Sequence, residues 1–357
     1  MGKKMFDSKS RVMKSLNFEK VDRIGRYEEF WPEFGEIVKN ELGLKEDVSL
    51  EEYFHIDIHI AYPEEGIKPS GIEVLSEDDT YIVERGTWGS VWRKKKIGYF
   101  LEFMEPAARE PEDFFKVSFD PPNLDSRYES WLEEVQREKD KGKCVFGKIG
   151  GPYLRTALVR GEENFLMDIA AEPDIAKEMA SKMADHLLAI GIEELKRGNL
   201  YDTGIWIFDD MGSNKGPMMS PGSFEYIFYP AYKKIVSGLR KEGAAKVGLH
   251  SDGNILPILD MLVDAGIDVL NPVEPRAGMY VPDLLKKYNK KLSYVGGICN
   301  SIVLPTGTRE EIISKTREII ECARDGGVVI GSHSIGPDIP VENYLAYYRT
   351  VMTEGYF

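Results

Sequence analysis

The sequence predicts a (β/α)8 barrel of eight parallel strands and surrounding helices over residues 1–357, with a β-rich insertion in its N-terminal part. From about residue 144, short apolar runs alternate with longer amphipathic segments, as in parallel strands joined by helices. The runs are nearly continuously apolar, which is typical of strands covered on both faces. No G-x-G-x-x-G sequence follows any run, so an open dinucleotide-binding sheet has no support. Polar residues recur where the runs end, and barrel enzymes have their active sites at that end.

The expected elements follow one another along the chain. Residues 24–30 are expected to form the first barrel strand. Ser220 and Pro221 mark a helix start, because Ser can accept a hydrogen bond from a free backbone N–H and Pro suits the first helical turn. The later strands are expected at 144–149, 204–208, 246–249, 268–271, 292–295 and 328–330, and further helices at 175–196, 255–263, 309–324 and 341–352.

Residues 72–104 form the β-rich insertion, which is expected as a hairpin or small sheet near the barrel mouth. The runs 81–85, 90–93 and 99–104 are rich in strand-forming residues and are separated by Gly. Its aromatic residues either cover an aromatic ligand or form a small core of the insertion. These residues are Trp88, Trp92, Tyr99 and Phe103.

Charge and composition exclude several classes of function. The net charge of -14 repels phosphate backbones, so we expect no nucleic-acid partner. The three cysteines, Cys144, Cys299 and Cys322, are too scattered for a disulfide framework, which fits a reducing cytoplasm. No apolar run reaches the ~18 residues of a membrane span, and no apolar segment follows the basic N-terminus. We therefore expect a cytoplasmic protein that does not contact membranes.

Two histidines and a carboxylate fall at the ends of expected strands. His250 and Asp252 are two residues apart, which on an extended backbone points both side chains to one face, and Gly253 allows a sharp turn after them. His333 follows a later strand and would face the same cavity in a barrel. Imidazole and carboxylate groups suit Zn²⁺, Fe²⁺ or Mn²⁺, so these three residues are candidate metal ligands. The alternative is a pair of hydrogen-bonded histidines without a metal.

Three further carboxylates at strand ends are candidate catalytic residues. Glu274 follows the strand between those that carry the two histidines, and it is a fourth ligand, a general base or a partner of Arg276. Asp209 and Asp210 end the strand before His250. Paired carboxylates can bind substrate hydroxyls or share a proton, and the alternative is that one of the two caps a helix.

Residues after the first strand are expected to line the barrel mouth and bind substrate. A separate segment has His55, Asp57 and His59 at alternating positions, which would place them on one face of a strand. That face is either a second site or a half-exposed sheet edge. The candidate substrate-binding residues are Tyr27, Glu28, Trp31, His59 and Asn300.

The segment Gly248–Pro272 resembles the central motif of the uroporphyrinogen decarboxylase superfamily. Tyr294–Ile298, Leu304–Thr308 and Ile330–Pro340 are also similar to segments of that superfamily. The resemblance extends from about residue 140 to the end and more weakly through the N-terminal part. It implies a barrel fold and one of two activities, cofactor-free decarboxylation or cobamide-dependent methyl transfer.

The resemblance also implies a metal site. The methyltransferases of this superfamily bind zinc through a His-x-Cys pair and a later Cys. By the resemblance, His250 falls on that His, Asp252 on the first Cys and His333 on the second. Each position thus keeps a metal-ligand residue type, but no thiolate remains.

This exchange of ligands favours an oxygen-linked methyl donor. Without thiolates, a bound Zn²⁺ keeps more positive charge and is a harder Lewis acid, better suited to an oxygen ligand. The chain then resembles the substrate-side methyltransferase of O-demethylase systems, which takes methyl groups from methoxylated aromatics. The acceptor would be the Co(I) corrinoid (a cobalamin-type cofactor) of a partner protein, since this sequence has no Asp-x-His-x-x-Gly motif.

Other functions stay open at this stage. A corrinoid methyltransferase that uses a thiol or amine donor would keep the same metal site. A decarboxylase of the uroporphyrinogen type needs a basic pocket, whereas Arg26 is followed closely by Glu28 and Glu29. A barrel that only binds a ligand or a corrinoid protein is the non-enzymatic alternative. The sequence leaves open whether the chain forms a homo-oligomer.

Overall fold

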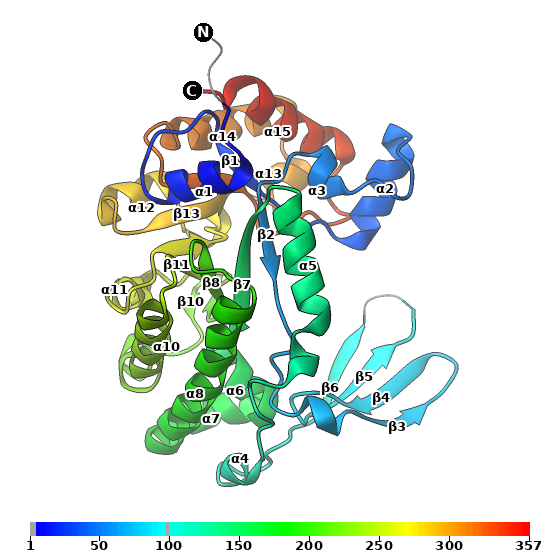
Figure 1. Cartoon of the computed structure of the whole chain (residues 1–357), viewed down its shortest axis with the longest axis vertical. Helices are drawn as coiled ribbons and strands as arrows, with labels where there is room; N and C mark the ends of the chain where they lie inside the picture. The colour runs from blue at the N-terminus through cyan, green and yellow to red at the C-terminus, as the bar shows by residue number, and fades with distance from the viewer. Residues whose placement is uncertain (1–4, 98–99) are drawn as a thin grey trace.

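Eight parallel strands form a nearly closed barrel in the computed structural model, which describes residues 5–97 and 100–357 (Figure 1). The strands pair in the order β1-β14-β13-β12-β11-β8-β7-β2. Asp57, just before β2, donates a backbone hydrogen bond to the carbonyl of Arg26 in β1, which brings the two end strands together. The predicted fold class is confirmed. The strands are β1 (Gly25–Tyr27), β2 (Ile58–Ala61), β7 (Cys144–Gly150), β8 (Gly204–Phe208), β11 (Lys246–His250), β12 (Val269–Asn271), β13 (Ser293–Gly297) and β14 (Val328–Gly331).

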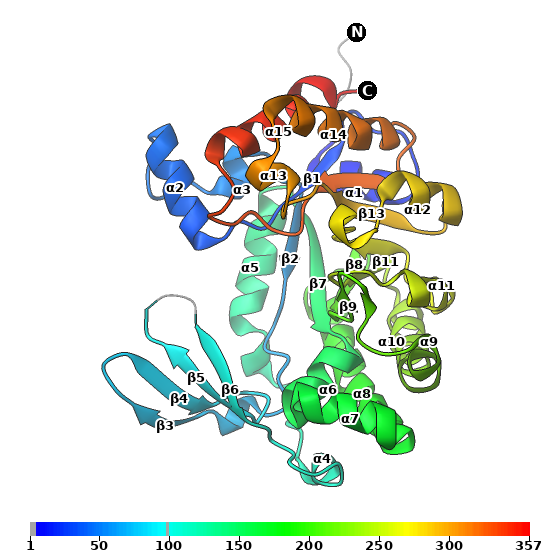
Figure 2. The ribbon, with the colours of Figure 1, turned by 180° about the vertical axis from the view of Figure 1, so that it is seen from behind.

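Helices surround the barrel and return the chain between parallel strands (Figures 1 and 2). Ser220 caps a helix start as expected, because its side chain accepts a hydrogen bond from the Ser223 N–H. None of the helices in the described ranges is long and apolar enough to cross a membrane. The helices are α1 (Ser8–Leu16), α2 (Pro32–Leu42), α3 (Leu50–Tyr53), α4 (Asp113–Lys116), α5 (Glu129–Asp140), α6 (Pro152–Arg160), α7 (Glu162–Ala171), α8 (Pro173–Arg197), α9 (Pro221–Ser223), α10 (Tyr229–Glu242), α11 (Leu256–Asp264), α12 (Val281–Tyr288), α13 (Val303–Thr306), α14 (Arg309–Cys322) and α15 (Val341–Glu354). Shorter elements are η1 (Pro69–Gly71), η2 (Asp125–Arg127), η3 (Phe224–Phe228), η4 (Pro275–Ala277), β9 (Gly212–Ser213) and β10 (Gly216–Pro217).

The barrel interior is a core of packed side chains. Successive residues of a strand alternate between the interior and the helices outside. Trp206 is fully buried, with its ring centroid 5.8 Å from that of Tyr27 and 5.9 Å from that of Phe146. Helix α1 closes the opposite end. The side chains of this interior core are Val12, Leu16, Tyr27, Ile58, Ile60, Cys144, Phe146, Trp206, Val269, Val295 and Val329.

The short strand β2 corrects one expectation from the sequence. His55, Asp57 and His59 do not share one face of a strand, because β2 begins only at Ile58 and His55 has a positive φ of 54°. Asp57 precedes the strand and pairs with Arg11 and Arg23. Only His59 lies within β2, and it points away from the interior core that Ile58 joins.

The insertion forms a separate antiparallel sheet in the order β3-β4-β5-β6, which confirms a β-rich insertion in the N-terminal part (Figure 2). Tyr99, one of the four aromatic residues considered for the insertion, and residue 98 lie outside the described residues. The ring of Trp92 lies 5.0 Å from that of Phe103, edge to face, while Trp88 lies 5.3 Å from the guanidinium carbon of Arg155 in α6. The sheet consists of β3 (Glu73–Glu77), β4 (Tyr81–Arg85), β5 (Val91–Lys95) and β6 (Leu101–Glu105).

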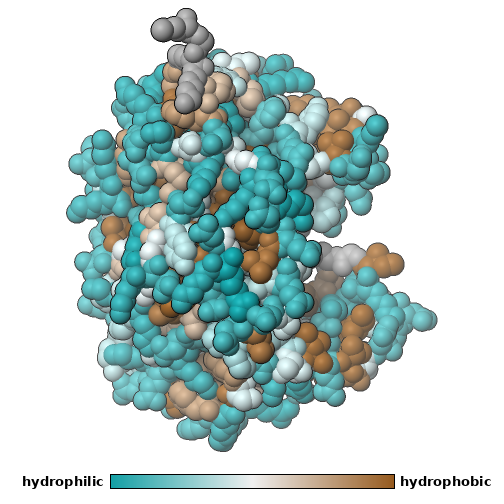
Figure 3. Space-filling model, in the orientation of Figure 1, coloured by the Kyte–Doolittle hydropathy of each residue, from teal (hydrophilic) through white to brown (hydrophobic). Residues whose placement is uncertain are grey.

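The molecular surface is hollowed between the insertion and the segment that carries α2 (Figure 3). On the α2 side of this hollow lies a cavity of about 810 Å³. Its lining combines aromatic and acidic residues. They are Glu29, Phe30, Trp31, Pro32, Glu33, Glu36 and Tyr62.

Candidate active site

Two imidazoles and one carboxylate converge at the carboxyl ends of the barrel strands. His250 is the last residue of β11, Asp252 follows two residues later, and His333 follows β14. The Nε2 of His250 lies 3.6 Å from Oδ1 of Asp252, and the Nε2 of His333 lies 3.4 Å from its Oδ2. One ligand atom of each residue lies within 4.8 Å of the others. The three residues predicted from the sequence as candidate metal ligands are thus neighbours in space.

The environment of His250 determines which ring nitrogen faces this cluster. Asn271, at the end of β12, is fully buried, and its Nδ2 donates to the carbonyl of Val295 at 2.9 Å. Its Oδ1 therefore faces Nδ1 of His250, at 2.5 Å, so that Nδ1 carries the proton and donates it. The phenyl ring of Phe208 stacks on the imidazole with 4.4 Å between centroids. Nε2 is left facing Asp252, and in the neutral imidazole this nitrogen has the free lone pair that metal binding requires.

Asp252 has an oxygen without a hydrogen-bond partner. Its Oδ1 is buried and accepts no hydrogen bond from any described residue. Burial raises the pKa of Asp252, while the neighbouring His333 and His250 act in the opposite direction. A buried carboxylate oxygen normally has a partner, because leaving it unpaired costs about 1–3 kcal/mol. A cation at this position would supply that partner.

The cluster has the spacing of a zinc site. Zn²⁺ binds imidazole nitrogen and carboxylate oxygen at about 2.0–2.2 Å, so two ligand atoms of a tetrahedral site are about 3.4 Å apart. The nitrogen–oxygen separations are close to this value, 3.6 Å from His250 to Oδ1 of Asp252 and 3.4 Å from His333 to its Oδ2. The donors are neutral nitrogen and anionic oxygen, which suit Zn²⁺ and other divalent transition metals. His250, Asp252 and His333 can therefore hold such an ion and leave a position for substrate.

Glu274 and Gly253 shape the loop that holds Asp252. An oxygen of Glu274 accepts the backbone N–H of Gly253 at 2.6 Å. Gly253 has φ of 75°, and a Cβ there would lie 2.6 Å from the backbone of Gly212. In the described part of the chain, no ion pair joins Glu274 to Arg276. Glu274 thus lies beside the cluster and connects the loops after β11 and β12.

The adjacent carboxylates Asp209 and Asp210 have different environments. Asp209 is fully buried and accepts backbone hydrogen bonds from Tyr153 and Leu154 at the start of α6, as well as the hydroxyl of Tyr232. Burial raises the pKa of Asp209 to about 6 against the effect of these donors. Asp210 has an oxygen 3.8 Å from Nε2 of His250 and accepts the N–H of Asp252 at 3.2 Å. Of the two, Asp210 faces the cluster and Asp209 caps a helix.

Two of the candidate substrate residues support loops near the cluster. The buried Glu28 accepts hydrogen bonds from the side chain and backbone N–H of Ser332, the residue before His333. Asn300 donates at 3.0 Å to the carbonyl of Ser334, the residue after His333. Both interactions hold the segment that carries His333.

The other candidate substrate residues lie in three different places. Tyr27 projects into the barrel core, and its hydroxyl donates to Glu29 at 2.6 Å. Trp31 is 42% exposed and lines the cavity of about 810 Å³. His59 lies outside the barrel wall, with Nε2 2.7 Å from Glu134 and Nδ1 3.5 Å from Glu51. Burial lowers the pKa of His59, but these two carboxylates raise it to about 9.

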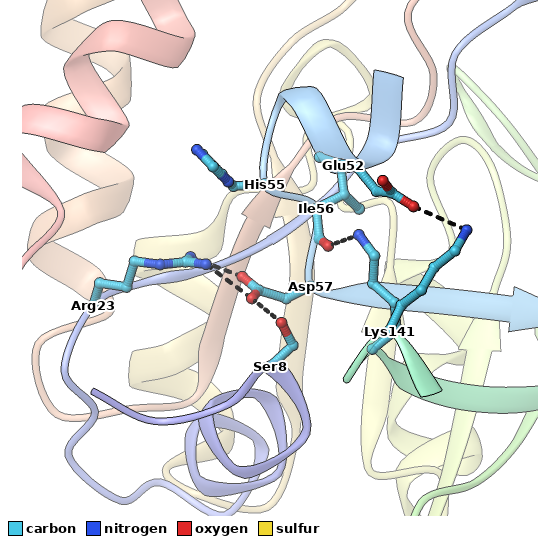
Figure 4. A pocket seen from close by; sticks show the side chains of 8 residues that line it. Ser8, Arg23, Glu52, His55, Ile56, Asp57 and Lys141 are labelled. Atoms are coloured by element: carbon cyan, nitrogen blue, oxygen red, sulfur yellow. Dashed lines mark hydrogen bonds and ion pairs between the residues drawn. The ribbon is translucent and has the colours of Figure 1, made fainter. Parts of the chain in front are cut away.

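A second polar cavity, of about 370 Å³, lies at the opposite end of β2 (Figure 4). Most of its charged groups are paired with one another, and Lys143 donates to the carbonyl of Ile56. Arg23 donates to Asp57 from two nitrogens, and Lys141 pairs with Glu52. Because these groups satisfy each other away from the carboxyl ends of the strands, this cavity offers no comparable set of free donors.

Sequence reasoning missed several residues beside the cluster, chiefly Lys148, Phe208 and Asn271. Each occupies an inward position near the end of its strand. For Lys148, a signal was available: it is a lysine within an apolar strand, at the same parity as the interior residues Cys144 and Phe146. For Asn271, the signal was a polar residue at a strand end next to that of His250.

Comparisons with known proteins agree with this architecture. The model of the uroporphyrinogen decarboxylase (URO-D) family matches residues 100–353 of the 357-residue chain. A methyltransferase from Methanosarcina mazei is 17% identical, with a TM-score of 0.71, and the alignment covers 97% of this chain and 98% of that one. A B12-independent methionine synthase from Shewanella sp. W3-18-1 is 11% identical over 94% of this chain and 93% of its own, with a TM-score of 0.45. Among curated proteins, no sequence matches.

Proposed function

Because this chain belongs to the uroporphyrinogen decarboxylase (URO-D) family, we propose that it is a methyltransferase of that family. It transfers the methyl group of a methoxylated aromatic compound to the Co(I) corrinoid of a partner protein. His250, Asp252 and His333 hold a Zn²⁺ ion that serves this reaction. The observation that carries the proposal is the convergence of two imidazole nitrogens on the carboxylate of Asp252, whose buried Oδ1 lacks a hydrogen-bond partner.

The ligand set supports an oxygen-linked donor. Two neutral imidazoles and one carboxylate leave a bound Zn²⁺ with a net charge of about +1, whereas two thiolates would neutralise it. When bound, the ion supplies Lewis acidity that weakens the bond between an ether oxygen and its methyl carbon. The similarity in fold to the Methanosarcina mazei methyltransferase, over nearly the whole chain, supports methyl transfer as the reaction type.

The chain's own residues have separate tasks in this reaction. Asn271 keeps the proton on Nδ1 of His250, and Glu28 holds the segment before His333. As the methyl group moves to cobalt, the aryl oxygen leaves as a phenolate and needs a proton. Asp210 and Glu274 flank the cluster and are the nearest candidates to orient the substrate or deliver that proton.

A decarboxylase that binds a polycarboxylate porphyrinogen fits this site less well. Arg26 is fully buried, and its guanidinium bonds the carbonyl of Phe54 and the hydroxyl of Tyr344. Arg23 pairs with Asp57 at the far end of the barrel. Neither arginine can reach a substrate at the barrel mouth in this arrangement.

The test combines metal content with methyl transfer. Purified wild type should contain about one zinc per chain and transfer methyl from 2-methoxyphenol to cob(I)alamin, with a thiol and an amine methyl donor run in parallel. His250→Ala should lose both properties, while His55→Ala, at the opposite end of β2, should keep both. If wild type holds no stoichiometric metal and His250→Ala transfers methyl normally, the proposal is wrong. Faster transfer from the thiol or amine would instead identify a different donor.

A further inference from the structure

Lys148 is a buried cation at the active-site end of the barrel. It lies in β7, whose residues Cys144 and Phe146 join the interior core, so alternation directs Lys148 to the same side. The residue is 9% exposed. A lysine in this position loses its hydration, and the free-energy cost of that loss is offset only if the ammonium has anionic or polar partners.

The partners of Lys148 leave a surplus of positive charge. Its Nζ lies 3.2 Å from Oε1 of Glu65, and the guanidinium of Arg155 bonds the same oxygen. The other oxygen of Glu65 accepts the backbone N–H of Gly150. Burial raises the pKa of Glu65, but Arg155 and Lys148 lower it to about 2, so the carboxylate stays ionised. Two cations thus share one anion.

Lys148 also retains unused donors. An ammonium group has three N–H donors, and the contact with Glu65 uses one of them in the described structure. Its remaining neighbours are aromatic faces, with Nζ 4.8 Å from the ring centroid of Tyr62 and 5.2 Å from that of Phe208. Tyr62 is 64% exposed and also lines the cavity beside Trp31. Tyr62 thus lies between the ammonium and that cavity.

One aromatic ring separates this cation from the candidate metal ligands. Phe208 contacts Lys148 and, through its ring face, stacks on His250 at 4.4 Å. The charged groups that contact Asp252 and His250 in the described residues are carboxylates or imidazoles, whereas lysine and arginine side chains lie at Lys148 and Arg155. In 4-methoxybenzoate the carboxylate and the ether oxygen lie on opposite sides of one ring. The molecule thus carries, at its two ends, the two chemical groups that the two parts of the site would bind.

We propose that Lys148, assisted by Arg155, binds the carboxylate of a methoxybenzoate whose methoxy group lies at His250, Asp252 and His333. This inference rests on the proposed methyl transfer and specifies its substrate class. Glu65 holds the two cations in place and neutralises one of them. Tyr62 and Phe208 are the aromatic rings beside the ammonium, and Tyr62 also lines the cavity next to Trp31.

Binding measurements without any corrinoid test the subsite independently of methyl transfer. Isothermal titration of wild type with 4-methoxybenzoate and with its neutral analogue 4-methoxybenzamide should show about 10- to 100-fold tighter binding of the acid, the range expected for hydrogen bonds to a charged group. Equal affinities for acid and amide would overturn the inference, and this comparison needs no variant.

Three variants test whether Lys148 causes this preference for the acid. Lys148→Gln should remove the preference for the acid, Lys148→Arg should keep most of it, and Lys20→Gln, an exposed lysine on the protein surface, should leave it unchanged. Thermal unfolding of each variant shows whether it is folded. A folded Lys148→Gln variant that still prefers the acid contradicts the inference.

Methyl-transfer assays with cob(I)alamin then separate the two proposals. Transfer from 2-methoxyphenol combined with equal binding of acid and amide would retain the proposed function and reject the subsite. Acid binding that depends on Lys148, without transfer from any methoxyarene, would retain the anion subsite and reject the proposed function.

Discussion

Replacing Asn271 with Leu tests whether the orientation of His250 controls metal binding. Asn271 is fully buried and makes two hydrogen bonds, one from Nδ1 of His250 at 2.5 Å and one to the Val295 carbonyl at 2.9 Å. Leucine has a similar size but removes both interactions. With the acceptor gone, the imidazole can rotate or carry its proton on Nε2, the nitrogen that faces Asp252.

The expected magnitudes follow from these contacts. Loss of a hydrogen-bonded partner of a metal-binding histidine typically reduces metal affinity about 10- to 100-fold. The two buried groups left unpaired should lower the free energy of unfolding by about 2–4 kcal/mol. The zinc affinity of Asn271→Leu, measured by competition with a chromogenic chelator, should therefore decrease by one to two orders of magnitude, with methyl transfer reduced in parallel.

Asn343→Leu is the matched control, since Asn343 donates one hydrogen bond to the Leu304 carbonyl and does not contact the cluster. It should bind zinc as tightly as wild type. If folded Asn271→Leu also binds zinc like wild type, Asn271 does not set the orientation of His250, and the reasoning fails.

Three other substitutions give different expected results. His59→Gln should remove a pH-dependent contribution to the free energy of unfolding, which denaturant unfolding measures. The pKa of His59 in the folded protein, about 9, exceeds its ordinary value of about 6.5. Protonated His59 therefore stabilises the fold by about 2–3 kcal/mol below pH 6.5, and this stabilisation is lost as the pH rises through 9. Asp209→Asn should lower the free energy of unfolding by about 1–3 kcal/mol, because an amide cannot accept all three hydrogen bonds that the carboxylate accepts. Asp210→Asn should leave the free energy of unfolding unchanged and slow methyl transfer at least about tenfold. Gly253→Ala should cost about 1–3 kcal/mol and weaken zinc binding, because φ is 75° and the added Cβ meets Gly212.

Controls accompany these three predictions. His55→Gln should not show the same loss of stability between pH 6.5 and 9, since the His55 pKa is lowered, first by burial. If Asp210→Asn unfolds more easily than Asp209→Asn, the division of roles between these two carboxylates is reversed. A Gly253→Ala variant with wild-type stability and zinc affinity would show that the loop tolerates a side chain at that position.

Most barrel strands could be predicted from the sequence because both of their faces are buried. The continuous apolar run of β7 is one example, and β8 is another. The segment around β2 was expected to be a strand that begins at about His55, but it was not assigned to the barrel, because β2 has only four residues and contains a histidine. Its direction depends on pairing with β7, a contact between segments 86 residues apart in the register Ile58↔Cys144.

The candidate ligands could also be selected from the sequence, since strand ends in a barrel converge on one cavity. The sequence alone could not show which of two neighbouring residues faces that cavity. Asp209 and Asp210 are adjacent, and only their packing shows that one caps α6 and the other faces His250. Lys148 was overlooked because an apolar run was taken as a wholly apolar strand. Its role depends on Arg155 in the following helix and on Glu65, which lies 83 residues earlier in the chain.

X-ray absorption spectroscopy at the zinc edge of the purified protein tests the central claim most directly. The claim is that His250, Asp252 and His333 bind the ion without a thiolate. The spectrum should show only nitrogen and oxygen neighbours, at about 2.0–2.2 Å. A sulfur neighbour at about 2.3 Å or the absence of bound zinc would contradict it.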